Sequence, residues 1–380
     1  MSAALSIESV KSQASGLSYR NQAFIGGKFQ AAASGKTFDC VSPIDGKVLT
    51  QVAAGDKEDV DRAVKAARAA FEDGRWSRMA PAKRKKVMLR WAELLEKHTT
   101  ELALLETLDM GKPIGDSTRI DIPAVVNCIR WYAEAVDKVY DEVAPTGSDA
   151  VAMLVREPVG VVGAVVPWNF PLLMAAWKLG PALATGCTVV LKPAEETPLS
   201  AIRLGELILE AGFPAGVVNI VTGFGETAGA PLAAHPDVDK IAFTGSTEVG
   251  RLFLKYSAES NLKEVVLECG GKSPQVVFED ALLDEAVPSI LAAAFWNMSE
   301  NCSCGSRLIV HSSLKDTLLQ KLKQGLSSWK VGLPTDPDVS IGPMVEKAHF
   351  EKVASFLQNP GKNAKLVHGG RIHSDLGSGW

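Results

Sequence analysis

A carboxylate and a thiol stand on two separate loops of this sequence, each after an apolar run. Glu268 lies in VVLECGGKSP (residues 265–274), where a β-branched segment enters a Gly-Gly turn. Cys302 lies in NMSENCSCGSR (residues 297–307), a loop of small residues. Such a pair suits covalent catalysis, in which a thiolate attacks an electrophilic carbon and a carboxylate activates water. Because little of a free thiol is ionised at neutral pH, the nucleophile depends on its surroundings.

The choice between two neighbouring thiols stays open at this point. Cys304 follows Cys302 by two residues, and the residue pattern alone favours Cys302 only modestly. A buried, unreactive side chain is the usual alternative for any single cysteine. The C-x-C spacing is not one that zinc sites use, and the closest histidine is His311, so we expect no metal.

Strand-like and helix-like segments alternate with short connections over residues 160–268. This alternation predicts an α/β fold with a parallel, doubly wound sheet and helices on both faces. Ligands of such sheets bind at the carboxyl ends of the strands, so we expect a dinucleotide there. The residues at those ends are Asn169, Lys192, Glu195, Gly223, Ser246 and Glu268.

Three of these positions fit a dinucleotide, and each has a plainer alternative. Ser246 ends a strand and opens a helix, where amides could receive a pyrophosphate, but a simple serine cap explains it equally. Glu195 could bind ribose hydroxyls and repel a 2′-phosphate, which favours NAD over NADP; otherwise it is a solvated loop residue. The GxGxxxG stretch at 223–229 is weak, since an ordinary turn also explains it.

The segment PWNFP (residues 167–171) places two prolines and two aromatic side chains around Asn169. Prolines at both ends make a rigid turn, which is a costly arrangement for a mere connector. A side-chain amide can donate to a developing oxyanion, a role worth about 3–4 kcal/mol in well-studied enzymes. The alternative is a packed turn with a hydrogen-bonded asparagine, and we favour the functional interpretation.

The composition is that of an ordinary globular protein. Of the 380 residues, 46% are apolar and 22% charged, and the net charge is −4. That charge offers no basic field for nucleic acid or an acidic membrane. The sequence shows no apolar run of bilayer length, no secretory signal pattern and six sparse cysteines. We therefore expect a soluble cytoplasmic protein with reduced thiols.

The segments outside this alternating region predict a helical layer and a second α/β portion. Residues 1–20 read as a loose polar arm, and Gly-Gly and Asp-Gly pairs predict hairpins within 24–35 and 38–52. Charged residues in the first third read as a solvated face. Residues 150–156 are either an ordinary strand or an exposed ribbon that pairs with another subunit. Helices are expected over residues 60–74, 83–98, 101–108, 123–140, 281–296 and 314–326, a turn followed by a helix over 341–356, and a strand with a turn over 364–380.

Together these motifs resemble the NAD(P)-dependent aldehyde dehydrogenase superfamily. The matching segments are PWNFP (167–171), KPAEETP (192–198), GFGETAG (223–229), FTGSTEVG (243–250), LECGGKSP (267–274) and N-x4-C-x2-GSR (297–307). Within the superfamily, residues 130–142 and the Trp177-Lys178 pair look most like dehydrogenases of γ-aminobutyraldehyde and its γ-glutamyl conjugate. The resemblance implies NAD as cofactor, a small aldehyde oxidised to its acid, and a homo-oligomer.

The resemblance also assigns roles to residues. Cys302 would be the nucleophile, Glu268 the general base, and Asn169 with the Cys302 amide the oxyanion hole. The cofactor would contact Trp168, Lys192, Glu195, Gly225 and Ser246, and the substrate Phe170, Met174 and Trp177. Asp109 could meet a substrate ammonium, although a helix-end carboxylate near Lys112 is the plainer interpretation. Residues 1–139 and 159–267 would form the NAD-binding domain, 140–158 an oligomerisation ribbon, and 268–380 an incomplete catalytic domain.

The sequence departs from the family pattern beside the nucleophile and near its end. Ser299-Glu300 stands where the family usually has Gly-Gln, so Ser299 could disturb the backbone and Glu300 could disfavour a thiolate. The family's later Glu-x-Phe-Gly-Pro motif does not occur, so we expect a C-terminally truncated relative. Two alternatives follow, namely an inactive nucleotide-binding or oligomerising relative and a cofactor-independent cysteine esterase.

Overall fold

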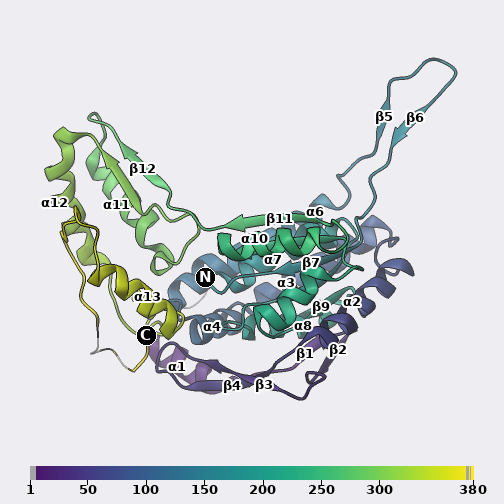
Figure 1. The fold of residues 1–380 in the computed structure, drawn as a ribbon, viewed down its shortest axis with the longest axis horizontal. Helices are drawn as coiled ribbons and strands as arrows, with labels where there is room; N and C mark the ends of the chain where they lie inside the picture. The colour runs from purple at the N-terminus through teal and green to yellow at the C-terminus, as the bar shows by residue number, and fades with distance from the viewer. Residues whose placement is uncertain (1–5, 374–375, 377) are drawn as a thin grey trace.

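The computed structural model describes residues 6–373, 376 and 378–380, and its centre is a seven-stranded sheet (Figure 1). The strand order is β11-β10-β7-β8-β9-β1-β2. The strands are β1 (Ala23–Ile25), β2 (Lys28–Gln30), β7 (Val161–Val165), β8 (Thr188–Lys192), β9 (Val218–Ile220), β10 (Lys240–Gly245) and β11 (Glu264–Cys269). The five strands β7 to β11 run parallel, which confirms the α/β prediction.

The β1–β2 hairpin makes the sheet mixed, which the sequence did not reveal. Gly26 and Gly27 have φ values of 60° and 79°, and such a two-residue turn matches the twist of a hairpin. Phe24 pairs antiparallel with Ile220 of β9. The hairpin itself was predicted, but its place at the edge of the main sheet depends on contacts that are far apart in sequence.

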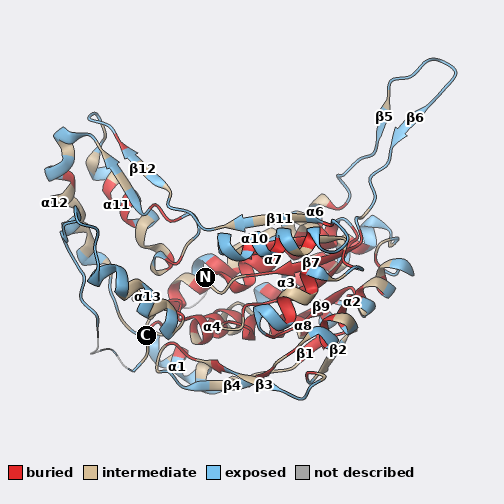
Figure 2. Cartoon of the chain, viewed as in Figure 1, coloured by how far each residue is buried: buried red, intermediate tan, exposed pale blue. Residues whose placement is uncertain are grey.

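Two layers of helices cover the sheet. One core cluster contains Val162, Ala164 and Leu191, while the other contains Val161, Val165 and Val190. Alternate residues of each strand therefore enter opposite cores, as a sheet covered on both faces requires. The first layer holds α3 (Pro81–Lys97), α6 (Ile122–Ala135), α7 (Pro171–Ala184) and α8 (Leu199–Ala211); the second holds α2 (Lys57–Glu72), η2 (Gly225–Gly229), α9 (Ala230–Ala234) and α10 (Thr247–Ala258). Figure 2 shows the buried residues concentrated in these layers.

The helix α4 (Thr99–Met110) lies in the first layer and is buried along most of its length. It is followed by α5 (Ile114–Asp116) and η1 (Ser117–Asp121), which lead into α6. The carboxylates Glu106 and Asp109 and the ammonium of Lys112 are all buried. The expectation of a solvated charged face is therefore wrong for this stretch.

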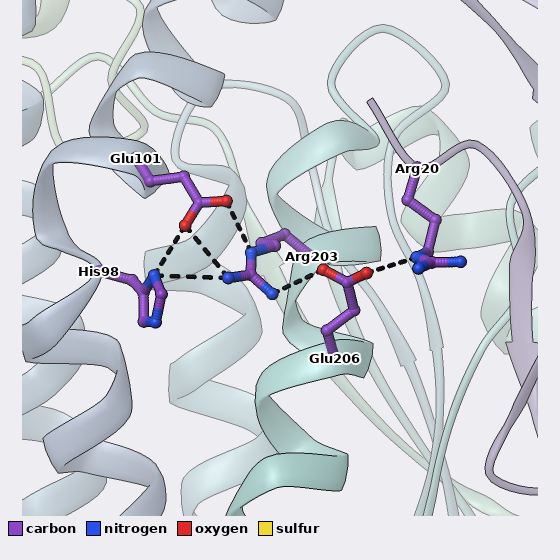
Figure 3. Close-up of polar contacts among 5 residues, drawn as sticks. All are labelled: Arg20, His98, Glu101, Arg203 and Glu206. Carbon is purple, nitrogen blue, oxygen red and sulfur yellow. Dashed lines mark hydrogen bonds and ion pairs between the residues drawn. The ribbon is translucent and has the colours of Figure 1, made fainter. Parts of the chain in front are cut away.

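The first twenty residues are not a loose arm within the described range. Residues Ile7–Ser15 form α1, whose N-cap Ser6 accepts a hydrogen bond from the Ser9 amide. Val10 is buried in the first core cluster. After the helix, Arg20 pairs with Glu206, which belongs to a network with Arg203, Glu101 and His98 that links the segment to α8 and α4 (Figure 3).

Two small sheets and a ribbon complete the first part of the chain. The strands β3 (Thr37–Val41) and β4 (Val48–Ala53) form the second predicted hairpin. The strands β5 (Glu142–Ala144) and β6 (Ala152–Leu154) form an antiparallel ribbon that projects from the body (Figure 1). Every residue of β6 is exposed, so this segment is a ribbon and not a strand of the main sheet. α6 ends at Ala135, five residues before the predicted Tyr140.

The second α/β portion follows β11. It contains β12 (Pro274–Val277), α11 (Leu283–Phe295), η3 (Trp296–Ser299), β13 (Arg307–Val310), η4 (Ser312–Leu314), α12 (Lys315–Gly325), η5 (Leu326–Ser328) and α13 (Lys347–Gln358). β12 and β13 pair in parallel. The strand expected over 364–380 is absent from the described residues of that stretch, where no neighbouring strand offers ladder hydrogen bonds. Within the described part of the chain, no helix is both long and apolar enough to span a membrane.

Candidate active site

The predicted cofactor and catalytic residues gather along one edge of the sheet. β11, β10, β7 and β8 are consecutive neighbours and parallel, so their carboxyl ends lie at the same edge. Glu268 lies one residue before the end of β11, and Ser246, Asn169 and Glu195 follow the ends of β10, β7 and β8. The sheet therefore brings together four positions that are as far as 99 residues apart in the numbering.

Hydrogen bonds tie the turn that carries Asn169 to the loop that carries Cys302. The Nδ2 atom of Asn169 donates to the carbonyl oxygen of Glu300 at 2.8 Å. The buried Asn297 donates through Nδ2 to the carbonyl oxygens of Asn169 at 3.2 Å and Glu300 at 3.0 Å. Asn297 therefore joins the two loops directly, and the amide predicted to stabilise an oxyanion lies beside the nucleophile loop.

The backbone before Cys302 is left-handed over three consecutive residues. Asn297, Met298 and Ser299 have φ values of 51°, 58° and 64°. Asparagine tolerates this region, but serine and methionine are disfavoured there. The hydroxyl of Ser299 donates to the carbonyl oxygen of Ala294 at 2.7 Å. The expected disturbance at Ser299 is thus present as a strained conformation that the loop nevertheless retains.

The two thiols of the loop differ in exposure. Cys302 is exposed, whereas Cys304 is buried and its Sγ atom donates to the carbonyl oxygen of Ala294 at 3.2 Å. Burial raises the pKa of the Cys304 thiol, which makes a thiolate there less accessible. The structure adds to the preference for Cys302 that the sequence left modest.

Glu268 lies at the end of β11 with an exposed side chain. The next residues turn against the nucleophile loop, since a Cβ on Gly271 would lie 3.4 Å from the carbonyl oxygen of Cys302. Lys178 is buried close by and donates to Thr244 Oγ1 at 2.6 Å. Burial lowers the pKa of Lys178 to about 8, and the charge of Glu268 opposes that shift. Glu268 thus has both solvent access and a basic neighbour.

The predicted cofactor residues lie at the ends of β8 and β10 and on the connections that follow β7 and β9. Lys192 donates to Glu195 Oε2 at 2.6 Å, and the Glu195 side chain is partly exposed. Ser246 is the N-cap of α10 and accepts the Val249 amide at 3.2 Å. A Cβ on Gly225 would meet no described atom within 4 Å, which leaves room for a ligand. Trp168 lies beside His349, with ring centroids 5.2 Å apart.

The predicted substrate residues occupy different environments on or beside α7. Trp177 is 54% exposed, whereas Met174 and Phe170 belong to the core. Phe170 packs against Trp296, and Lys112 Nζ lies 4.1 Å from its ring centroid. Asp109 is fully buried and accepts the amide of Leu199 at 3.1 Å, so the plainer interpretation as a helix-end carboxylate is favoured.

A buried acidic cluster behind these loops was not predicted from the sequence. Lys112 pairs with Asp121, and both side chains are buried. Burial raises the pKa of Glu106 to about 7. Burial likewise raises the pKa of Glu300 to about 8, and His349 Nε2 lies 3.4 Å from its Oε1. The only sign of this cluster in the sequence is the high density of charged residues next to the glycine and proline that end α4. That these charged side chains are buried is shown by the tertiary structure alone. The described residues contain no group of three or more potential metal ligands.

The fold and this site define an α/β enzyme with a thiol and a carboxylate at the ligand-binding edge of a parallel sheet. The profile of the aldehyde dehydrogenase family matches residues 29–380. The protein belongs to the aldehyde dehydrogenase family.

Several relatives are close in sequence. An aminoacetaldehyde dehydrogenase of Pseudomonas aeruginosa is 55% identical over 358 residues, which are 94% of this chain and 72% of the relative. The NADP/NAD-dependent aldehyde dehydrogenase PuuC of Escherichia coli is 51% identical over 356 residues, or 93% and 72% of the two chains. The protein is therefore similar to aldehyde dehydrogenases over nearly its whole length and spans about three quarters of theirs.

Solved structures give the same result. An indole-3-acetaldehyde dehydrogenase complexed with NAD+ has a TM-score of 0.97 and 50% identity, covering 99% of this chain and 76% of the other. The γ-glutamyl-γ-aminobutyraldehyde dehydrogenase of Burkholderia cenocepacia J2315 has the same TM-score, identity and coverage. These likenesses confirm the predicted fold and family.

Proposed function

We propose that this aldehyde dehydrogenase oxidises its substrate through a covalent intermediate on Cys302, with NAD as the cofactor. The observation that carries the proposal is the hydrogen-bonded junction of the Asn169 turn with the loop of the exposed Cys302. Cys302 attacks the aldehyde carbon to form a thiohemiacetal. Asn169 and the Cys302 amide donate to the resulting oxyanion. After oxidation, Glu268 takes a proton from water, which attacks the thioester and releases the acid.

NAD supplies the acceptor for the hydride in this scheme. Ser246 and the amides at the start of α10 suit the pyrophosphate, and Gly225 leaves space beside it. Lys192, Glu195 and Trp168 complete the proposed cofactor site. The carboxylate of Glu195 favours NAD over NADP because it would repel a 2′-phosphate. The relative PuuC is named for both NADP and NAD, so both cofactors are to be compared.

The substrate that we propose is an aminoaldehyde, such as γ-aminobutyraldehyde or its γ-glutamyl conjugate. Relatives named for aminoacetaldehyde and γ-glutamyl-γ-aminobutyraldehyde support this class. The exposed Trp177, with Met174 and Phe170 behind it, would line the substrate side. Indole-3-acetaldehyde is the informative competitor, because another relative of equal similarity is named for it.

The arrangement of the whole protein follows from the same proposal. Residues 1–139 and 159–267 would form the cofactor domain, and 268–380 the catalytic domain. The exposed ribbon within 140–158 carries apolar side chains at Val143, Met153 and Leu154 and would pair with a second copy of the chain. We propose a cytoplasmic homo-oligomer.

The test measures NADH formation by the purified chain with a panel of aminoaldehydes and aromatic aldehydes. We expect turnover with aminoaldehydes, its loss in Cys302→Ala and its retention in Cys304→Ala. NAD binding without turnover on any aldehyde would instead identify a non-catalytic relative. Ester hydrolysis that requires Cys302 but proceeds without NAD, in a chain that forms no NADH, would identify a cysteine esterase.

A further inference from the structure

The helices α7 and α8 begin without a capping bond from their own N-cap residues in the described structure. The N-cap residues are Phe170 and Pro198, and neither side chain accepts a first-turn amide. The first amides of a helix have no partner inside the helix, so a buried helix start requires an acceptor from elsewhere. Both starts are buried here.

One helix supplies both acceptors. Glu106 Oε1 accepts the Leu172 amide at 2.8 Å, and Asp109 Oδ2 accepts the Leu199 amide at 3.1 Å. The two carboxylates are three residues apart on α4, and residues at that spacing share one face of a helix. Their exposed fractions are 1% and 0%. One face of α4 therefore caps two other helices.

Each capped amide closely follows a residue of the proposed active site. Leu172 is three residues after Asn169, and Leu199 is four residues after Glu195. The short connections of β7 to α7 and of β8 to α8 carry these two side chains. Burial raises the pKa of both carboxyl groups, and a carboxyl oxygen accepts the amide hydrogen whether the group is ionised or protonated. The position of each connection therefore depends on its own carboxylate.

We propose that Glu106 and Asp109 are separate positioning residues, Glu106 for the oxyanion donor Asn169 and Asp109 for the cofactor-binding Glu195. The buried side chain of Lys112 supports the role proposed for Glu106. It pairs with Asp121 and lies against the ring of Phe170, which is next to Asn169 in the sequence. Because both carboxyl groups are buried, the proposed roles involve no contact with substrate or cofactor. The proposal rests on the roles proposed above for Asn169 and Glu195.

The test compares Glu106→Met with Asp109→Leu. These replacements keep much of the side-chain volume while they remove the acceptor, and apolar residues of similar volume often replace buried charges without loss of folding. Three quantities are measured: hydrolysis of p-nitrophenyl acetate without NAD, the Kd for NAD, and amide hydrogen exchange in residues 171–176 and 198–204.

We expect the two variants to separate. Glu106→Met should slow ester hydrolysis about tenfold or more, because small displacements of a catalytic group are costly, and should change the Kd for NAD by less than about twofold. Asp109→Leu should show the reverse pattern, with the Kd raised about tenfold. Faster exchange should be confined to residues 171–176 in the first variant and to 198–204 in the second.

Two further variants serve as controls. Glu106→Gln keeps an oxygen that accepts the Leu172 amide and should restore most of the ester hydrolysis. Glu101→Gln removes another carboxylate of α4. Glu101 pairs with the side chains of Arg203 and His98 (Figure 3) and not with the start of α7 or α8. This variant should leave ester hydrolysis, NAD affinity and amide exchange near those of the unmodified chain.

The proposal is overturned if both variants change hydrolysis, NAD affinity and exchange together, or if Glu106→Met does not fold where Glu106→Gln does. Either result would make the carboxylates general supports of the core. If the unmodified chain hydrolyses no ester and oxidises no aldehyde, the proposed function fails alone. The exchange pattern at Leu172 and Leu199 would then still decide whether the two carboxylates act separately.

Discussion

The two sides of the candidate active site hold their functional groups in different ways. Asn169 lies on a turn between a buried strand and a helix whose first amide is held by Glu106. Cys302 lies on a loop entered through three consecutive left-handed residues that are not glycine. The first side is fixed by the sheet and by a buried carboxyl group, and the second is fixed by a few hydrogen bonds across a strained backbone.

This difference suggests a division of tasks. A donor that stabilises a developing charge acts best when it is preorganised, so a rigid connection suits Asn169. A nucleophile that forms and breaks a covalent bond must adjust to the substrate at each step. Asn297 is the link between the two sides, because its amide reaches the carbonyl oxygens of both Asn169 and Glu300.

The largest effect is expected from removal of that link. Asn297→Ala leaves two buried carbonyl oxygens without this donor and places alanine in a left-handed conformation. The unpaired carbonyl oxygens cost about 1–3 kcal/mol, and the left-handed alanine costs about 1–2 kcal/mol. The free energy of unfolding should therefore fall by about 3 kcal/mol. Aldehyde turnover should fall more than tenfold, because the two sides lose their alignment. Urea unfolding and NADH formation measure the two effects.

Asn297→Gly separates the amide from the backbone conformation. Glycine adopts the left-handed region freely, so the variant lacks the amide but not the geometry. We expect it to lose turnover as strongly as Asn297→Ala. Full turnover in Asn297→Gly would mean that the amide does not align the two sides and that only the backbone conformation matters.

A smaller effect is expected from the buried carboxyl of Glu300. Burial raises its pKa from an ordinary value of 4.5 to about 8. The unfolded chain therefore releases this proton as the pH rises through about 4.5, while the folded chain keeps it until about 8. The contribution of Glu300 to stability is complete below pH 4.5 and is lost as the pH rises through that window.

Glu300→Gln should remove this loss. Since one pKa unit corresponds to about 1.4 kcal/mol, the variant should be more stable than the unmodified chain by about 3 kcal/mol at about pH 6.5, roughly two units above the unfolded pKa of 4.5. Near pH 4.5 the two should be nearly equal. Urea unfolding at several pH values measures the difference, and Glu285→Gln on the exposed face of α11 is the matched control. A parallel pH dependence in Glu300→Gln and the unmodified chain would refute the assignment.

The contrast between the two sides also shows what the sequence could predict. The strands β7, β8, β10 and β11 follow from local apolar runs between turn residues, and their parallel arrangement follows from the alternation with helices. Asn169, Glu195, Ser246 and Glu268 could be placed at strand ends for that reason. The exposure of Cys302 and the burial of Cys304 could not, because both thiols have nearly the same local sequence context.

The contacts that hold these residues are long-range, and no local pattern indicates them. The Glu106–Leu172 and Asp109–Leu199 bonds span 66 and 90 residues. The same limit explains why residues 1–20 were predicted as an arm, since Val10 of α1 is buried only against residues far along the chain. Local patterns thus predict which residues end the strands, but not which distant side chains fix them there.

The smallest effect concerns the strain on the nucleophile side. Ser299 is left-handed, with φ at 64°, and a β-branched residue is less tolerant of that region than serine. Ser299→Val should lower the free energy of unfolding by about 2 kcal/mol. Ser299→Gly should change it by less than about 1 kcal/mol, because relief of the strain is offset by the lost hydroxyl bond to Ala294 and by a freer unfolded chain. Urea unfolding measures the stability of both variants. If the Ser299→Val chain is as stable as the unmodified one, this loop is not strained, and the contrast with the Asn169 side is lost.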